Sequence, residues 1–186
     1  MEPVAIVALI VVAVLVVGLI AMYNGLVRRR LQTDEAWAQV GVALKRRHDL
    51  VPNLVNAVRG YMGFEQSVLT QVTTARAAAV AAGAQGPAAG AAENVLTGAL
   101  RSLFAVVESY PDLRATENVQ SLQGQLATTE GMIASARDGY NAAVRDYNTS
   151  IATFPMVLMA GPMGFSSREF FEAEPAAAEV PAVELQ

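Results

Sequence analysis

The pattern of hydrophobic and polar positions begins with an uninterrupted apolar run. Residues 3–22 read "PVAIVALIVVAVLVVGLIAM", twenty residues without a charge. A helix of that length rises about 30 Å, which matches the hydrocarbon core of a bilayer. A buried core helix and a cleaved signal peptide are the alternatives, but a signal peptide carries a positive residue before its apolar run and a small-residue cleavage site after it. Neither is evident here, so we expect an uncleaved transmembrane signal anchor in residues 1–27.

Beyond this run, hydrophobic residues recur at steps of three and four, and the strict alternation that marks strands is missing. The clearest series extends from Val119 to Ile151, with a period near 3.5 that favours coiled-coil-like packing against other helices. The sequence therefore predicts an all-α fold with a helical body over residues 28–154. The residues that we expect at helix interfaces are Trp37, Leu44, Leu54, Tyr61, Leu122, Leu126, Ile133, Tyr140, Val144 and Tyr147.

Proline and glycine divide the body. Asp49 and Pro52 predict a helix corner, because Asp49 can cap a new helix with Pro52 in its first turn; a kink in one long helix is the alternative. A Gly/Ala-rich stretch predicts a loop at about residues 81–92, and "ESYPDLRATEN" predicts a break at about 110–116. Residues 155–172 are apolar and broken by Gly and Pro, so we expect a segment that docks on the bundle or on a neighbouring chain. Residues 173–186 are rich in Ala, Pro and Glu and predict a disordered acidic tail.

Charge is distributed unevenly along the chain. Residues 1–80 hold eight cations and five acids, about +3, and residues 81–186 hold five cations and twelve acids, about −7. Arg28, Arg29 and Arg30 follow the apolar run at the depth of lipid phosphates, so we expect them to contact headgroups. Positive charge beside a span stays in the cytoplasm, which predicts an outside N-terminus and a cytoplasmic body. The basic stripe that a nucleic-acid partner requires is missing.

The segment with the highest density of charged and polar residues is "LKRRHDLVPNLV", residues 44–55. A metal site needs several converging ligands, but His48 is the only histidine and two arginines flank it. We expect a solvated His48 near a helix end, and salt bridges from the cations at 45–47 to Asp49 or to acids of the distal helices. The chain has no cysteine, so thiolate chemistry and disulfides are excluded. No paired carboxylates or nucleophile motif stand out, which predicts a protein that is not an enzyme and has no cofactor and no metal.

Five segments carry a resemblance to a known family. They are "YNGLVRRR" (23–30), "EAWAQVGVALKRRHDLVPNLVNAVRGY" (35–61), "ESYPDLRA" (108–115), "TEGMIASARDGYNAAVRDYNTSIATFP" (129–155) and "GFSSREFFE" (164–172). In this order they resemble the signature segments of the LemA family. The resemblance implies a single-pass bacterial membrane protein whose span continues into an antiparallel bundle of long helices, and it brings no enzymatic mechanism. The paired Tyr-Asn motifs then look structural, with Tyr140 and Tyr147 burying their rings in a helix interface and Asn141 and Asn148 fixing its register.

Two functions from different classes fit these features. The first is a membrane-anchored helical scaffold that self-associates into a homo-oligomer at the bacterial inner membrane, because the body has a long heptad-like helix and is rich in alanine. The second is a membrane-tethered adaptor that recruits a soluble signalling or proteolytic partner through the acidic distal half.

Overall fold

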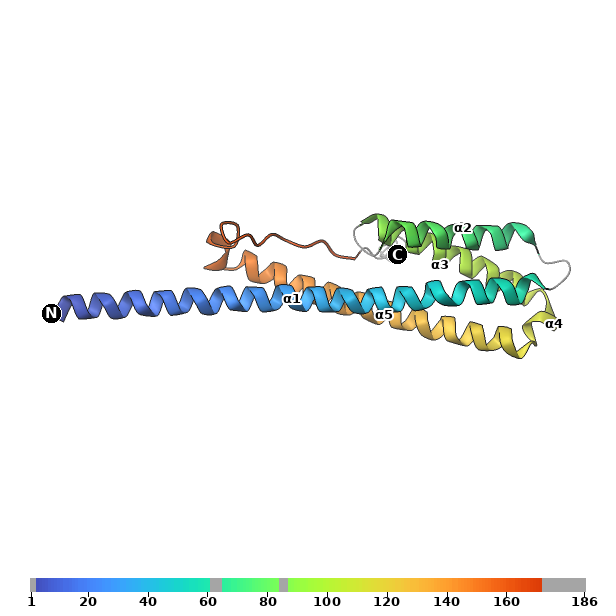
Figure 1. Cartoon of the computed structure of the whole chain (residues 1–186), viewed down its shortest axis with the longest axis horizontal. Helices are drawn as coiled ribbons and strands as arrows, with labels where there is room; N and C mark the ends of the chain where they lie inside the picture. Colours follow the sequence, from blue (N-terminus) through green and yellow to red (C-terminus); the bar gives the residue numbers. More distant parts are fainter. Residues whose placement is uncertain (1–2, 61–64, 84–86, 172–186) are drawn as a thin grey trace, which may run out of the picture. The chain divides into compact units, whose positions relative to one another are not determined.

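The computed structural model describes residues 3–60, 65–83 and 87–171, and these residues form helices and connecting turns without a strand (Figure 1). The all-α prediction is therefore confirmed for this part of the chain. Tyr61 and the tail at 173–186 lie outside the described residues. The elements in chain order are α1 (Pro3–Arg59), α2 (Gln66–Ala82), α3 (Pro87–Glu108), α4 (Pro111–Arg114), α5 (Glu117–Ala152) and the 3-10 helix η1 (Met156–Leu158).

Helix α1 is one continuous helix of 57 residues. Its N-terminal part is long and apolar enough to cross a membrane, and none of its most apolar stretch is buried within the structure. The helix also continues through Asp49 and Pro52, which differs from the corner expected there. No new helix begins at either residue. The physical reason is that the Arg76 side chain replaces the backbone hydrogen bond that Pro52 cannot donate.

The connection between α2 and α3 is shorter than the loop expected at 81–92, because α3 already begins at Pro87. Proline is suited to the first turn of a helix, where a missing N–H leaves no hydrogen bond unmade. The alanines that follow have the highest helix propensity and outweigh a glycine in the same turn. The break expected near 110–116 contains α4, which also starts on a proline and gives way to α5 at Glu117.

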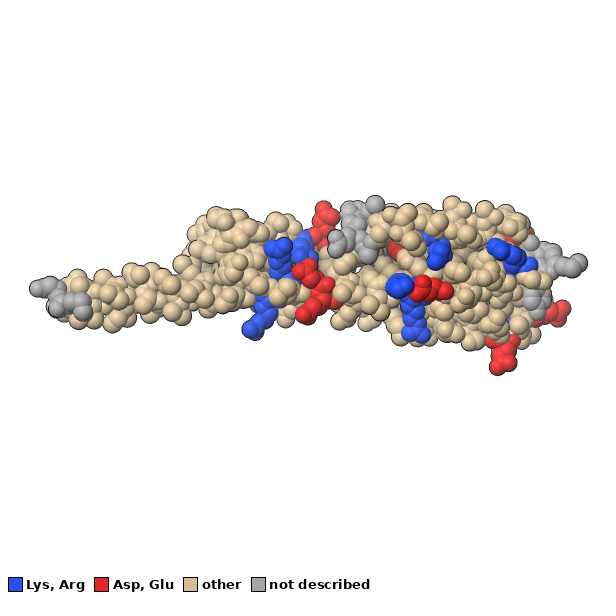
Figure 2. Space-filling view, in the orientation of Figure 1, with Lys and Arg blue, Asp and Glu red and all other residues tan. Residues whose placement is uncertain are grey.

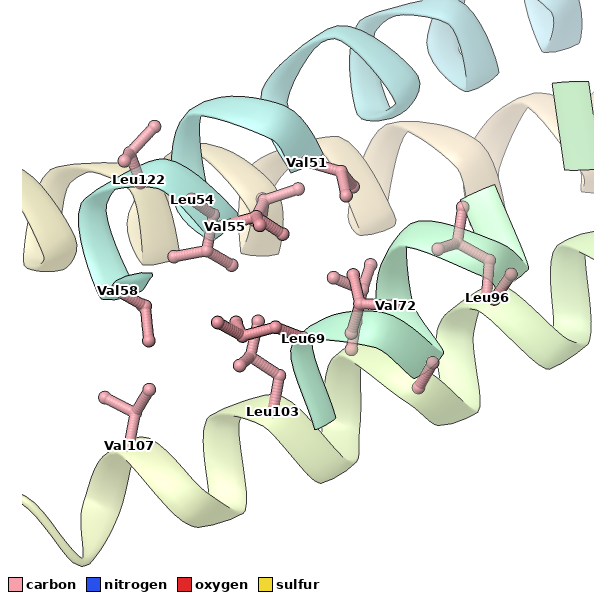
Figure 3. Close-up of a cluster of buried hydrophobic side chains, with 14 of the residues drawn as sticks. Val51, Leu54, Val55, Val58, Leu69, Val72, Leu96, Leu103, Val107 and Leu122 are labelled. Atoms are coloured by element: carbon pink, nitrogen blue, oxygen red, sulfur yellow. The ribbon is translucent and has the colours of Figure 1, made fainter. Parts of the chain in front are cut away.

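The chain forms two compact units. Unit 1 comprises Met1–Ala38 and Gly139–Phe170, and unit 2 comprises Gln39–Asp138 and Phe171–Gln186. Figure 3 shows the core of unit 2, in which side chains from four helices point toward one another. The labelled residues come from α1 (Val51, Leu54, Val55, Val58), α2 (Leu69, Val72), α3 (Leu96, Leu103, Val107) and α5 (Leu122).

The core of unit 1 joins α1 and α5 to the segment that follows α5. Its buried members are Leu26, Tyr147, Met156, Ala160 and Phe165. Of the residues expected at helix interfaces, Trp37 is half-buried, and the other described ones are buried: Leu44, Leu54, Leu122, Leu126, Ile133, Tyr140, Val144 and Tyr147.

Candidate functional site

The polar segment at residues 44–55 lies inside α1 and sends one of its cations into the core of unit 2. The side chain of Arg47 is completely buried and forms an ion pair with Glu93 of α3, which is also completely buried. Nη1 of Arg47 donates to Oγ1 of Thr97 at 2.9 Å and to Oε1 of Glu130 of α5 at 2.8 Å. We call these residues, together with His48, the Arg47 network. It joins three helices by charge-assisted hydrogen bonds, which are stronger than neutral ones.

His48 belongs to the same network, which corrects the expectation of a solvated histidine near a helix end. Its side chain is only 14% exposed, and Nε2 lies 2.8 Å from Oε1 of Glu93. Burial by itself raises the pKa of Glu93, but the hydrogen bond with His48 and the positive charge of Arg47 outweigh it and leave this pKa below its ordinary value. Glu93 is therefore a buried carboxylate, neutralised and oriented by its neighbours.

The backbone carbonyl of His48 explains why α1 continues through Pro52. Proline has no N–H, so Pro52 cannot donate to the carbonyl four residues earlier, which is that of His48. Nε of Arg76, from α2, donates to this oxygen at 2.7 Å. A side chain from a neighbouring helix thus supplies the hydrogen bond that the proline removes.

The other two cations of the segment remain on the surface. Lys45 pairs with Asp49 one turn away at 3.3 Å, and Nη1 of Arg46 lies 3.9 Å from Sδ of Met132. Both kinds of salt bridge expected for residues 45–47 are present, since Arg47 reaches distal acids. Within residues 3–60, 65–83 and 87–171, no group of three His, Asp or Glu side chains is placed to hold a metal ion. The arrangement ties helices together by hydrogen bonds and ion pairs.

In unit 1, the arginines at 28–30 are exposed on α1. Successive helical residues point about 100° apart, and Arg29 is the one that lines a groove of about 480 Å³ between α1 and α5. Arg145 of α5 lines the same groove, so two cations face it together with one acid, Asp146. The other lining residues are Met22, Gly25, Leu26, Thr149, Ser150, Thr153, Phe154 and Met156.

The extended segment after residue 165 is held against unit 1 by polar contacts. The Asn148 side chain both donates to the carbonyl of Arg168, at 2.8 Å, and accepts from its N–H, at 2.9 Å. The Tyr140 hydroxyl donates to the carbonyl of Glu169 at 3.0 Å, and the Tyr140 ring packs edge-on against Trp37. Burial is the largest cause that raises the pKa of Tyr140, so its hydroxyl stays protonated and able to donate. Asn148 thus holds the C-terminal segment, a role different from the helix register expected for it.

The last described aromatic residue of this segment packs within unit 2. Phe171 is buried, and the guanidinium of Arg137 lies 4.4 Å from the centre of its ring. Such a geometry is a cation–π contact.

Glu93, Arg76 and Arg145 are among the residues of these sites that sequence reasoning missed. A signal existed for the first two. Glu93 is the one charged residue between Arg76 and Arg101, and a lone acid in a helical apolar stretch needs a buried partner. A proline inside a helix implies a carbonyl that needs a donor. Arg145 gave no local signal, because only the packing of α5 brings it near α1.

The profile of the LemA family matches residues 36–185. The chain is 28% identical to magnetosome protein MamQ 2 of Paramagnetospirillum magneticum, over 91% of this chain and 73% of that protein. It is 27% identical to magnetosome protein MamQ of Magnetospirillum gryphiswaldense, over 85% and 67% of the two chains. It is 24% identical to protein LemA of Metamycoplasma hominis, over 81% and 68%. These matches confirm the resemblance found in the sequence.

Proposed function

The chain belongs to the LemA family, and from that premise we propose that it is a membrane-anchored helical scaffold without enzymatic activity, whose copies associate at the bacterial inner membrane. The observation that carries this proposal is the construction of α1. Its first twenty residues are uncharged and its large apolar side chains there are exposed, whereas later residues such as Val51 and Leu54 belong to a hydrophobic core. One helix therefore provides both the membrane anchor and one of the helices that pack around the hydrophobic core of the body.

The charges next to the anchor support lipid contact and an orientation. Arg28, Arg29 and Arg30 are exposed and are the first charged residues after the uncharged run, where guanidinium groups meet lipid phosphates. Arg145 adds a second cation to the groove that Arg29 lines. The same arginines favour a cytoplasmic body and an outside N-terminus by the positive-inside rule.

Self-association is supported by apolar side chains that the monomer leaves in water. Leu31 and Val42 of α1 are both exposed. They are eleven positions apart, which is close to three whole turns and places them on the same face of the helix. Ala38, two turns after Leu31 and one turn before Val42, is small and exposed, so it permits the close approach of a second helix.

The test is the particle mass in a native-like membrane. The full chain is extracted in lipid nanodiscs and weighed by mass photometry; particles of several copies are expected, and a purely monomeric population would refute the scaffold. Val42→Glu should shift the population toward smaller particles, because a charge would be buried at the contact. Val80→Glu is the matched control, since Val80 is also exposed but lies on α2.

The adaptor for a soluble protein partner is the second proposal, supported by the negative charge of residues 81–186, five cations against twelve acids. Deleting residues 173–186 separates the two proposals. A scaffold keeps its particle mass after the deletion, whereas an adaptor loses the partner that co-purifies with the full chain.

A further inference from the structure

The segment that follows α5 is unusually apolar for a connection. Residues 154–165 read "FPMVLMAGPMGF", without a charged, hydroxyl or amide side chain. We call these residues the apolar loop. Met156, Ala160 and Phe165 of this loop are buried against Leu26 and Tyr147.

This packing places the apolar loop beside the end of the span. Met22, the last residue of the uncharged run, is half-buried against the same cluster. The ring of Phe165 packs edge-on against Tyr23, with 5.6 Å between the ring centres. Figure 1 shows the loop folding back alongside α1 in the region of these residues. The loop therefore lies at the level where α1 leaves the hydrocarbon.

Three large hydrophobic side chains of the apolar loop stay exposed in the part of the chain that the structure describes. Phe154 is 77% exposed, Val157 53% and Leu158 69%. Three exposed apolar side chains within five residues of one loop would remain in water at a cost in a soluble setting. Tyr23, whose ring packs against Phe165, belongs to a residue type that is enriched at the membrane–water interface.

Most of the backbone N–H groups of the apolar loop are hydrogen-bonded within the chain. The N–H groups of residues 157–160 and 163–165 all donate to carbonyls of residues 153–161, at 2.8 to 3.2 Å, and Pro162 has no N–H. The turn closes at Gly164, whose φ of 78° is one that glycine adopts without strain. A segment at membrane depth must satisfy its backbone in this way, because lipid offers no hydrogen-bond partner.

The surface charge of unit 1 agrees with this placement. Figure 2 shows an uncharged surface along the N-terminal part of α1 and over the neighbouring loop, with the first blue side chains beyond it. Arg29 and Arg145 line the same groove as Phe154 and Met156 of the loop. Cations next to an uncharged patch are the arrangement expected where a protein meets phosphates above acyl chains.

We propose that the apolar loop inserts into the bilayer interface next to the emerging span, with Phe154, Val157 and Leu158 in contact with acyl chains. The occupant of this patch is lipid, because the patch continues the membrane-facing surface of α1. The inference rests on the proposed membrane anchor, and it adds a second point of attachment that the anchor alone does not require.

The test uses the full chain in vesicles of phosphatidylethanolamine and phosphatidylglycerol. The chain has no cysteine, so Leu158→Cys gives one site for an environment-sensitive fluorophore. We expect lipids with brominated acyl chains to quench this label, and aqueous iodide to quench it several-fold less than a label at Val80→Cys, an exposed position of α2. A label at Val12→Cys, within the apolar run, reports on the span.

Each outcome decides a different point. If the Val12 label is quenched by brominated lipid and the Leu158 label behaves like that at Val80, the membrane span is supported and the loop proposal is overturned. A Leu158 label that is shielded from iodide but untouched by brominated lipid indicates a protein occupant, such as a second copy, and also overturns it. If the Val12 label itself is not quenched by lipid, the anchor of the proposed function fails first.

A second measurement tests the side chains. With the label at Val157→Cys, the double substitution Phe154→Ser and Leu158→Ser should move the label into water, with a several-fold gain in iodide quenching. Val80→Ser, at an exposed position of α2, is the matched control and should leave the label unchanged. An equal response of the two variants contradicts insertion driven by these side chains.

Discussion

At the scale of residues, three neighbouring cations of α1 have different environments. Lys45 and Arg46 lie on the surface, whereas Arg47 is buried with Glu93. The difference follows from the helical step of about 100° per residue, which turns only one of three consecutive side chains toward the core. Guanidinium is the cation best suited to burial, because its planar fork of donors can satisfy several acceptors at once.

Arg47→Met should strongly destabilise unit 2. Removing one partner of a buried pair leaves an uncompensated buried charge, Glu93, and costs about 3–5 kcal/mol. The measurement is urea unfolding of the full chain in detergent, followed by circular dichroism. Lys45→Met is the matched control and should barely change stability, because the Lys45–Asp49 pair is exposed. Equal losses in the two variants would contradict the role of the Arg47 network.

Glu93 should make stability depend on pH in acid. Its pKa in the folded protein is below the ordinary value of 4.5, so the unfolded chain binds the proton more readily. The stabilisation from the ionised form is present above pH 4.5 and is lost as pH falls through the folded-state pKa. The free energy of unfolding of the wild type, measured from neutral pH downward, should fall more steeply in this range than that of Glu93→Gln. Glu35→Gln, at an exposed position of α1, should keep the wild-type slope.

Pro52 and Arg76 should be coupled through the carbonyl of His48. Arg76→Met removes the donor to a carbonyl that Pro52 leaves unpaired, and we expect a loss of about 1.5–3 kcal/mol, typical of a hydrogen bond to a charged group. In the background Pro52→Ala, the new N–H can bond this carbonyl, so the same substitution should cost less. A double-mutant cycle from unfolding free energies measures the coupling. Additive effects would mean that the two residues act independently.

At the scale of elements, the C-terminal segment is held by hydrogen bonds to α5 and by little regular structure of its own. Asn148 forms two bonds to the backbone of Arg168, and Tyr140 forms one to Glu169. An ion pair between Arg168 and Asp34 of α1, at 2.7 Å, adds a contact that is partly exposed. The segment is thus positioned by a few specific side chains.

Asn148→Ala should loosen this segment and leave the helices intact. Two lost hydrogen bonds at about 0.5–1.5 kcal/mol each correspond to about a 5- to 150-fold gain in local opening. Hydrogen exchange read by mass spectrometry should show faster exchange at residues 166–170 and unchanged rates in α3. Asn56→Ala, on the exposed face of α1, is the matched control; the same acceleration there would count against the proposed contact.

At the scale of the whole molecule, the side of the membrane decides which partners the body can meet. Three arginines follow the uncharged run, and moving each guanidinium through hydrocarbon costs on the order of 2.5–3.5 kcal/mol on insertion scales. A C-terminal alkaline phosphatase fusion should therefore be inactive and a C-terminal green fluorescent protein fusion bright. An active phosphatase would place the body outside and exclude a cytoplasmic partner. Neutral residues at 28–30 with arginines before Val4 should weaken or reverse the orientation.

The sequence by itself determined the features that depend on local composition and period. An uncharged run of twenty residues predicts an element that can span a bilayer whatever surrounds it, and a step of three to four predicts helices. Burial at Leu54, Leu126 and Tyr147 follows from the same period, because the apolar side of each helix must face the others. Family membership was readable for a similar reason, since the signature segments are contiguous.

Only the tertiary structure decided which polar groups meet. Pro52 alone predicts a break as readily as a continuous helix; the outcome depended on Arg76, which another helix brings to the carbonyl of His48. The environment of His48 likewise depended on Glu93, forty-five positions away in the chain. The apolar loop was recognisable as apolar, but its place beside Met22 and Leu26 required the chain to return along α5. Such contacts join residues distant in sequence, and no local pattern records them.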